Sequence, residues 1–187
     1  MKRNHLQIFS IILMIIFLNS CCQIFGTKYE YNENGGLRAK KQSFYKYKGD
    51  EVGDLSGLRF DGIYIRRHLG VNIFPDEQGF AYFRFFKSGH VHLCFLMDDY
   101  PTIDVINNLK SGIGGYFKVR NGIVKTEHII ERDCGTRVLE FGKIAEDRIE
   151  IYAQNPRTFY GYIPKNSRRV NWMFVKFENL SDEIPNW

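Results

Sequence analysis

The chain has 187 residues and a formal net charge of +5, with 16 Phe and 11 Tyr. This length is sufficient for one domain with a hydrophobic core. The positive charge is mild and is not gathered into a basic stripe, so the composition argues against a nucleic-acid partner. The abundant aromatic residues favour the half-buried surfaces of β-sheets.

The first twenty-two residues have the organisation of an export signal. Lys2 and Arg3 form a short basic region, and residues 6–18 form an almost continuous apolar run. About thirteen apolar residues are too few to cross a bilayer core, which needs ~20. The pattern predicts a signal peptide over residues 1–20 that is removed on maturation.

The end of this segment, Leu-Asn-Ser-Cys at residues 18–21, resembles the lipobox of bacterial lipoproteins. The resemblance implies cleavage before Cys21 and acylation of Cys21, including palmitate, so that the lipid anchors the chain in a cell membrane. Cys22 rather than Asp follows Cys21, and by analogy with the family this implies sorting to the outer membrane of a bacterial cell envelope.

Residues 21–56 are expected to form the acylated N-terminus and a flexible tether. The stretch is polar, poor in aliphatic residues, and contains Asn-Glu-Asn-Gly-Gly at residues 32–36, a composition typical of disordered linkers. Its aromatic residues leave an alternative open, in which part of the segment packs onto the folded domain. They are Tyr29, Tyr31, Phe44, Tyr45 and Tyr47.

Residues 57–180 are expected to form one β-domain, and residues 181–187 a C-terminal tail. Short alternating runs separated by turn residues are typical of strands, and the Asn121-Gly122 pair predicts a tight hairpin. Ile103, Ile106 and Leu109 lie near helical spacing, so residues 98–112 predict one short helix. The strand candidates are 59–67, 80–86, 90–97, 115–120, 123–130, 136–141, 148–153, 157–163 and 170–178.

Hairpin-linked strands must protect their edges, and closure into a barrel removes those edges. The sequence therefore predicts an all-β fold, an antiparallel up-and-down barrel of about eight strands with one short helix. A β-sandwich is the alternative.

Four segments within residues 57–178 resemble the lipocalin-like (calycin) domains of small bacterial lipoproteins. Asp-Gly-Ile-Tyr at residues 61–64 stands where lipocalins place Gly-x-Trp, and aromatic or glycine-containing hairpins occupy residues 85–91, 115–123 and 142–149. The resemblance implies a lipocalin-like barrel.

Five aromatic residues are candidates for lining a ligand cavity inside such a barrel, because pockets for small molecules are mostly apolar and aromatic. The alternative is a barrel filled by its own side chains. The candidates are Tyr82, Phe95, Tyr116, Tyr152 and Trp172.

His90, His92 and Cys94 form the one candidate metal site, because their spacing places all three on one face of a strand. Imidazole and thiolate ligands suit zinc or copper, and a fourth ligand would come from His128 or Cys134. The alternative is a mixed strand face without a metal. Whether Cys94 and Cys134 form a disulfide stays open at this stage.

No catalytic motif stands in the sequence: it contains no HExxH or CxxC motif and no glycine-rich phosphate loop. We therefore expect a protein that is not an enzyme and needs no cofactor. The expected function is a membrane-anchored, non-catalytic structural or interaction module of the envelope, with an envelope protein as possible partner. The alternative is lipocalin-like binding of a small apolar or amphipathic ligand.

Overall fold

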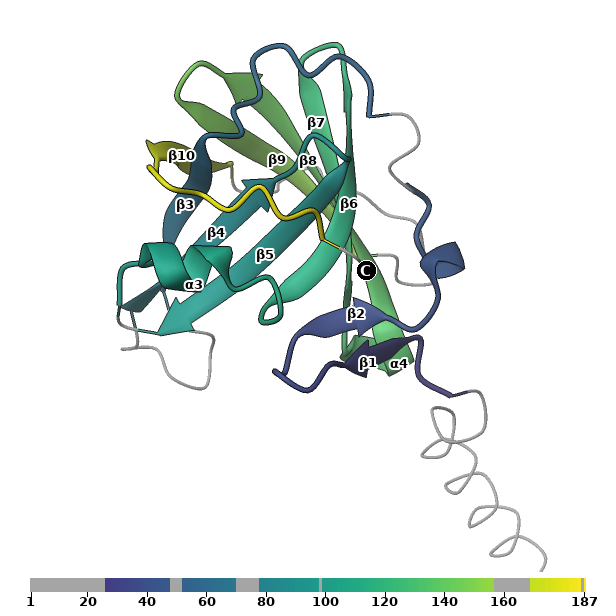
Figure 1. The fold of residues 1–187 in the computed structure, drawn as a ribbon. Coiled ribbons are helices and arrows are strands. Elements are labelled where there is room, and N and C mark those ends of the chain that lie inside the picture. Colours follow the sequence, from purple (N-terminus) through teal and green to yellow (C-terminus); the bar gives the residue numbers. More distant parts are fainter. Residues whose placement is uncertain (1–25, 48–51, 70–77, 98, 157–168, 186) are drawn as a thin grey trace, which may run out of the picture.

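The computed structural model describes residues 26–47, 52–69, 78–97, 99–156, 169–185 and 187. Within them, eight antiparallel strands form a closed barrel (Figure 1). Each strand pairs with its neighbours in sequence, and the pairing of β10 with β3 completes the ring. The strands are β3 (Gly62–Leu69), β4 (Gln78–Phe85), β5 (His90–Met97), β6 (Ile113–Arg120), β7 (Ile123–Ile130), β8 (Thr136–Ala145), β9 (Arg148–Pro156) and β10 (Val170–Lys176).

This arrangement confirms the predicted up-and-down, lipocalin-like barrel, and the sandwich alternative is wrong. The hairpin between β6 and β7 follows from its sequence, since Asn121 (φ 53°) and Gly122 (φ 70°) both adopt the positive φ that a type I′ turn requires. The predicted strand at 157–163 lies outside the described residues.

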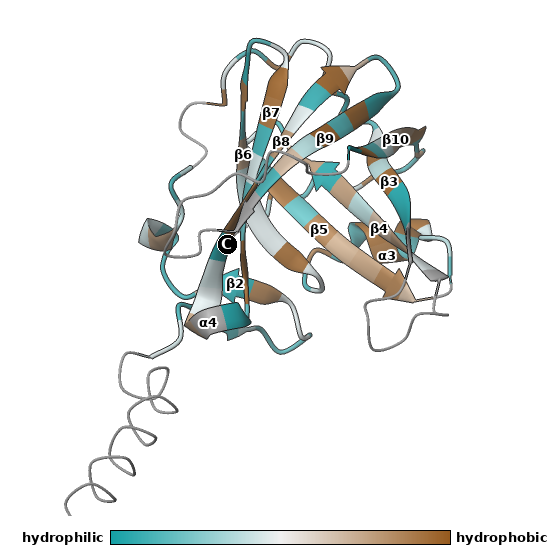
Figure 2. Ribbon diagram, turned by 180° about the vertical axis from the view of Figure 1, so that it is seen from behind, coloured by the Kyte–Doolittle hydropathy of each residue, from teal (hydrophilic) through white to brown (hydrophobic). Residues whose placement is uncertain are grey.

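The inner face of the barrel is packed with large side chains at one end. Phe83, Phe85 and Phe117 are buried there, with ring centroids of Phe85 and Phe117 4.9 Å apart. Figure 2 shows hydrophobic and hydrophilic residues alternating along strands such as β9. This alternation lets each strand turn apolar side chains inward.

Toward the other end of the barrel, the described side chains on the inner face of β5 become more exposed. Phe95 and Met97 follow Val91 and Leu93 at two-residue spacing on β5, so all four side chains point to the inner face. Val91 and Leu93 are buried, whereas Phe95 and Met97 are 52% and 58% exposed. We call this the open end.

The helix α3 (Ile103–Asn107) covers the outer face of β4 and β5 (Figure 1). Ile106 is fully buried there, and Arg84 from β4 donates a hydrogen bond to its carbonyl oxygen at 3.0 Å. The helix is shorter than the predicted 98–112. Thr102 is its N-terminal cap, with an extended backbone and a side chain that accepts a hydrogen bond from the N–H of Val105, and the chain leaves helical geometry at Asn108. None of the helices among the described residues is long and apolar enough to cross a bilayer.

Part of the segment for which the sequence predicts a tether is folded onto the barrel. The hairpin of β1 (Tyr29–Tyr31) and β2 (Leu37–Ala39) meets β6 through a parallel bridge, and the turn η1 (Gln42–Phe44) follows. Tyr45 and Tyr47 are buried, so the aromatic residues outweigh the polar composition. A second short helix, α4 (Arg132–Gly135), joins β7 to β8.

A buried carboxylate holds this N-terminal segment in place. Glu127, on the outer face of β7, accepts hydrogen bonds from the backbone N–H groups of Lys46 and Tyr47, with distances from 2.7 to 2.9 Å. Arg137 forms an ion pair with the same carboxylate at 3.2 Å. The chain thus neutralises a charge that would otherwise be costly to bury.

Candidate functional site

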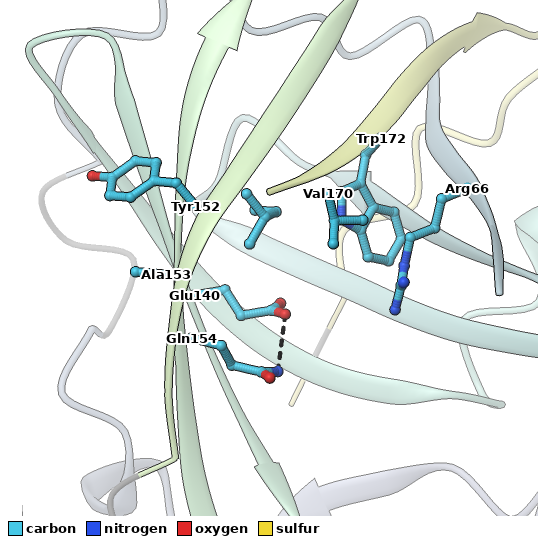
Figure 3. Close-up of a pocket in the computed structure, with 8 residues that line it drawn as sticks. Arg66, Glu140, Tyr152, Ala153, Gln154, Val170 and Trp172 are labelled. Atoms are coloured by element: carbon cyan, nitrogen blue, oxygen red, sulfur yellow. Dashed lines mark hydrogen bonds between the residues drawn. The ribbon is translucent and has the colours of Figure 1, made fainter. Parts of the chain in front are cut away.

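A cavity of about 290 Å³ lies inside the barrel toward its open end (Figure 3). Its walls come from β3, β8, β9 and β10, and they combine apolar side chains with three polar ones. The lining residues are Arg66, Glu140, Ile151, Tyr152, Ala153, Gln154, Val170 and Trp172.

A β-bulge between β8 and β9 shapes this wall. Gly142 pairs with Ile151 and Phe141 pairs with Ala153, so Tyr152 is an extra residue on β9. Because the bulge shifts the alternation by one residue, Ile151 and Gln154 both reach the cavity although their spacing is odd. The ring of Tyr152 points away from the other lining side chains (Figure 3).

Glu140 is the acidic group of the cavity. Its Oε1 accepts a hydrogen bond from Gln154 Nε2 at 3.1 Å, and its Oε2 accepts one from Thr126 Oγ1 at 3.4 Å. Burial raises the pKa of Glu140 to about 7, although the charge of Arg66 and these two hydrogen bonds act in the opposite direction. The carboxyl group therefore gains or loses a proton near neutral pH.

Arg66 is the basic group of the cavity. Its guanidinium lies 4.7 Å from the ring centroid of Trp172, and across the cavity from the Glu140 carboxyl group (Figure 3). Its Nε is buried without a hydrogen-bond partner. Among the described residues, no carboxylate forms an ion pair with Arg66, and burial lowers its pKa.

His128 adds a further buried polar group to the barrel interior. It lies two residues beyond Thr126 on β7 and so shares its inner face. Burial lowers the pKa of His128 to about 4, so the ring is neutral, and its Nδ1 has no hydrogen-bond partner.

Two of the five predicted ligand-lining aromatic residues belong to the cavity wall, and a third lies on the inner face of the barrel outside that wall. Trp172 lines it and packs on Phe83, with ring centroids 4.3 Å apart. Tyr152 belongs to its wall through the bulge, and Phe95 lies on the inner face of β5 at the open end.

The other two lie on the outside of the barrel. Tyr82 packs beneath α3, where its hydroxyl donates to the carbonyl oxygen of Val105 at 3.2 Å. Tyr116 contacts Tyr45 edge-on, and its hydroxyl donates to the carbonyl oxygen of Trp187 at 2.6 Å. The N-terminal segment and the C-terminus cover an outer face that a sequence pattern alone leaves exposed.

The three predicted metal ligands share the outer face of β5 but bind different neighbours. His90 Nδ1 lies 2.9 Å from Ser88 Oγ, and His92 Nε2 lies 2.7 Å from the carbonyl oxygen of Ser111. Burial lowers the pKa of His92 to about 4. Within the described part of the chain, no three His, Cys, Asp or Glu side chains gather as metal ligands.

The two cysteines of the barrel domain do not pair with each other. Cys94 is a buried free thiol, whereas Cys134 is disulfide-bonded. His128, the other proposed fourth ligand, lies on the inner face, opposite to His90 and His92.

Sequence reasoning missed Arg66, Glu140 and Gln154. Strand alternation could have identified the first two. Arg66 lies two residues after Tyr64 and Glu140 two residues after Val138, so each shares the inward face of its strand with a buried side chain. Gln154 could not be found in this way, since the bulge reverses the alternation. Comparisons with protein-family models, curated proteins and solved structures find no match for this chain.

Proposed function

We propose that the barrel binds a small amphipathic molecule with an anionic head group in the cavity between Arg66 and Glu140. The observation that carries this proposal is the buried Nε of Arg66, which has no hydrogen-bond partner and lies in a cavity of about 290 Å³. A buried donor without a partner is costly, and an anionic acceptor would satisfy it.

The remaining walls suit the apolar part of such a molecule. Trp172, Ile151 and Val170 line the cavity, and Phe95 and Met97, which are not part of its lining, lie exposed on the inner face of β5 at the same end of the barrel. A ligand with a charged head in the cavity and a short hydrocarbon tail toward the open end would meet both kinds of surface.

Glu140 gives the proposed site a dependence on pH. Below its pKa of about 7 the carboxyl group is neutral and can donate a hydrogen bond to an anionic head. Above that pH it becomes a carboxylate and repels the head. Binding of an anionic ligand should therefore weaken as the pH rises through 7.

The test compares two ligands with the same tail and opposite heads. Isothermal titration with laurate and with dodecyltrimethylammonium, both below their micellar concentrations, should show saturable binding of laurate alone. Arg66→Met should abolish that binding. Arg148→Met is the matched control, since Arg148 lies exposed at the start of β9 in an ion pair with Asp147. Equal binding of both ligands, or of neither, would contradict the proposal.

Membrane anchoring through acylated Cys21 is the second part of the proposed function, and the lipobox-like residues 18–21 support it. Cys21→Ser should move the protein from the membrane fraction to the soluble fraction of an exporting bacterium. A membrane-bound, normally processed Cys21→Ser product would contradict the anchor.

A structural or interaction role without a small ligand is the second candidate function. The exposed Met97 and Tyr100 near the open end favour it, because exposed apolar groups are typical of contact surfaces. Failure of the barrel to bind either detergent-like ligand, together with a stable complex in the envelope, would select this role.

A further inference from the structure

The cavity holds two groups of opposite charge that do not pair with each other. Arg66 stands on β3 and Glu140 on β8, and the guanidinium and the carboxyl group lie across the cavity from each other (Figure 3). Among the described residues, no ion pair joins Arg66 to a carboxylate. A site that keeps a cation and a carboxyl group apart is complementary to a molecule that carries both charges in the reverse order.

Neighbouring side chains keep each group on its own wall. The Arg66 guanidinium lies 4.7 Å from the ring centroid of Trp172, and the face of an indole ring attracts a cation. Glu140 accepts hydrogen bonds from Gln154 at 3.1 Å and from Thr126 at 3.4 Å. These contacts hold the two charged groups on opposite sides of a cavity of about 290 Å³.

Both groups retain unused hydrogen-bonding capacity. The Nε of Arg66 is buried and has no hydrogen-bond partner. Each oxygen of the Glu140 carboxyl group accepts one hydrogen bond from a described residue, whereas a carboxylate can accept about four in total. One wall of the cavity therefore offers a donor, and the other offers acceptor positions.

We propose that the ligand of this cavity is an amphipathic zwitterion, a single-chain molecule whose head group carries both an anionic and a cationic group. This inference rests on the proposed function and assigns the class of the ligand. The anionic group binds Arg66, and the cationic group binds Glu140. The hydrocarbon chain packs on the apolar wall formed by Ile151, Val170 and Trp172. A ligand with an anionic head alone satisfies Arg66 and leaves the acceptor positions of Glu140 unused.

The ionisation of Glu140 distinguishes a zwitterion from a simple anion. Burial raises the pKa of Glu140 to about 7, and Arg66 faces it from β3. His128 is the titratable residue on the inner face of the adjacent strand β7, and it stays neutral because burial lowers its pKa to about 4. The described inner faces of β9 and β10 present no charged group.

The two kinds of ligand should therefore respond to pH in opposite directions. A cationic group beside Glu140 favours the carboxylate, whereas an anionic group favours the carboxylic acid. Binding of a zwitterion should strengthen as the pH rises through 7, and binding of a simple anion should weaken over the same range.

Isothermal titration of the full chain with three ligands that share one hydrocarbon chain tests the inference. Octanoate carries the anion alone, octylammonium the cation alone, and α-aminooctanoate both. At pH 8 we expect α-aminooctanoate to bind at least about tenfold more tightly than octanoate, because it adds a hydrogen bond between charged groups. Octylammonium should show no saturable binding.

Proton exchange on binding gives a second measurement on the wild-type protein. Titrations at pH 7 in two buffers with different heats of ionisation count the protons that each ligand takes up or releases. Octanoate should cause an uptake of as much as about half a proton, and α-aminooctanoate a release of similar size, since Glu140 is close to half-protonated at this pH. Two values of the same sign would overturn the inference.

Glu140→Gln should remove the difference between the two ligands, because the amide carries no charge. The variant should bind octanoate and α-aminooctanoate with similar affinity and exchange no protons with either. Glu146→Gln is the matched control, since Glu146 is exposed at the turn between β8 and β9, and it should keep the preference of the wild type. A preference that persists in Glu140→Gln would show that the cationic group binds elsewhere.

A zwitterionic head group occurs both in free amino acids and in single-chain lipids. Octanoyl lysophosphatidylethanolamine, titrated below its micellar concentration, separates these sources, because its phosphate and ammonium groups lie further apart than the charged groups of α-aminooctanoate. Tighter binding of the lysolipid identifies a lipid head group, and the reverse order identifies an amino acid. Either order supports the zwitterion provided that Glu140→Gln weakens the binding.

The outcomes also separate this inference from the proposed function. If octanoate binds and neither zwitterion exceeds it at pH 8, the zwitterion is wrong and the anion-binding cavity stands. If the zwitterions bind and octanoate does not, an anionic head alone is insufficient and this inference stands. Absence of binding by all of these ligands would overturn both.

Discussion

Burial of one ionisable residue, Glu140, makes the stability of the fold depend on pH. Its folded-state pKa of about 7 lies above its ordinary value of 4.5, so the folded state binds a proton more tightly than the unfolded state. The stability that this group contributes is present below the unfolded pKa and is lost as the pH rises through about 7.

Glu140→Gln should therefore remove this loss, since the amide keeps the shape and does not ionise. We expect the variant to gain stability over the wild type at pH 8 and to show little difference at pH 4.5. Its binding of laurate should vary less between pH 6 and pH 8. Chemical denaturation at the two extremes of pH and titration at pH 6 and pH 8 measure both effects, and an unchanged difference between the variant and the wild type would contradict them.

His128 has the opposite dependence on pH. Its pKa is lowered from 6.5 to about 4 by burial, so the unfolded state binds the proton more tightly. The neutral ring contributes stability above pH 6.5, and that stability is lost as the pH falls toward 4.

His128→Leu should lose less stability than the wild type between pH 6.5 and pH 4.5, whatever its stability at pH 7. His90→Leu is the comparison: burial also lowers the pKa of His90, but His90 is only half-buried, so its removal should change the slope less than that of His128. The measurement is the unfolding free energy across this pH range. A His128→Leu slope as steep as that of the wild type would show that His128 binds a proton as readily in the folded state as in the unfolded state.

At the scale of elements, the N-terminal segment depends on one carboxylate. Glu127 accepts the backbone hydrogen bonds of Lys46 and Tyr47 and pairs with Arg137. Glu127→Ala leaves these donors without a partner, and we expect a loss of about 3 kcal/mol in unfolding free energy.

Hydrogen exchange distinguishes this effect from general destabilisation. The amides of Lys46 and Tyr47 should lose protection in Glu127→Ala while those of β9 keep it. Glu146→Ala, at an exposed turn between β8 and β9, should change neither. Protected amides at Lys46 and Tyr47 in the Glu127 variant would show that other contacts, such as the packing of Tyr45 and the pairing of β2 with β6, hold the segment.

The strands could be predicted because alternation and turn residues are local properties. Asn121-Gly122 determines a hairpin by its own conformational preferences, whatever surrounds it. The outer layer could not be predicted in this way. The burial of Tyr116 depends on Tyr45 and Trp187, which are distant in sequence. The inward position of Gln154 depends on a β-bulge that the local sequence pattern does not predict.

The two ends of the barrel differ in how tightly their inner faces are packed. At the packed end, Phe117 is fully buried against Phe85, and a side chain of this kind stabilises the fold without reaching a ligand. At the open end, Phe95 points inward yet is 52% exposed. Stability and binding should therefore respond to different substitutions.

Phe117→Ala should lose about 3–5 kcal/mol of unfolding free energy, because it leaves a cavity in a close-packed core. Its affinity for laurate should stay within a factor of two at a temperature where it remains folded. Phe95→Ala should change stability by less than about 1 kcal/mol and weaken laurate binding several-fold, because the tail loses apolar contact. Denaturant unfolding and titration on both variants measure the two effects. If Phe95→Ala destabilised the fold as much as Phe117→Ala and left binding unchanged, the open end would be core, and the ligand would have to bind elsewhere.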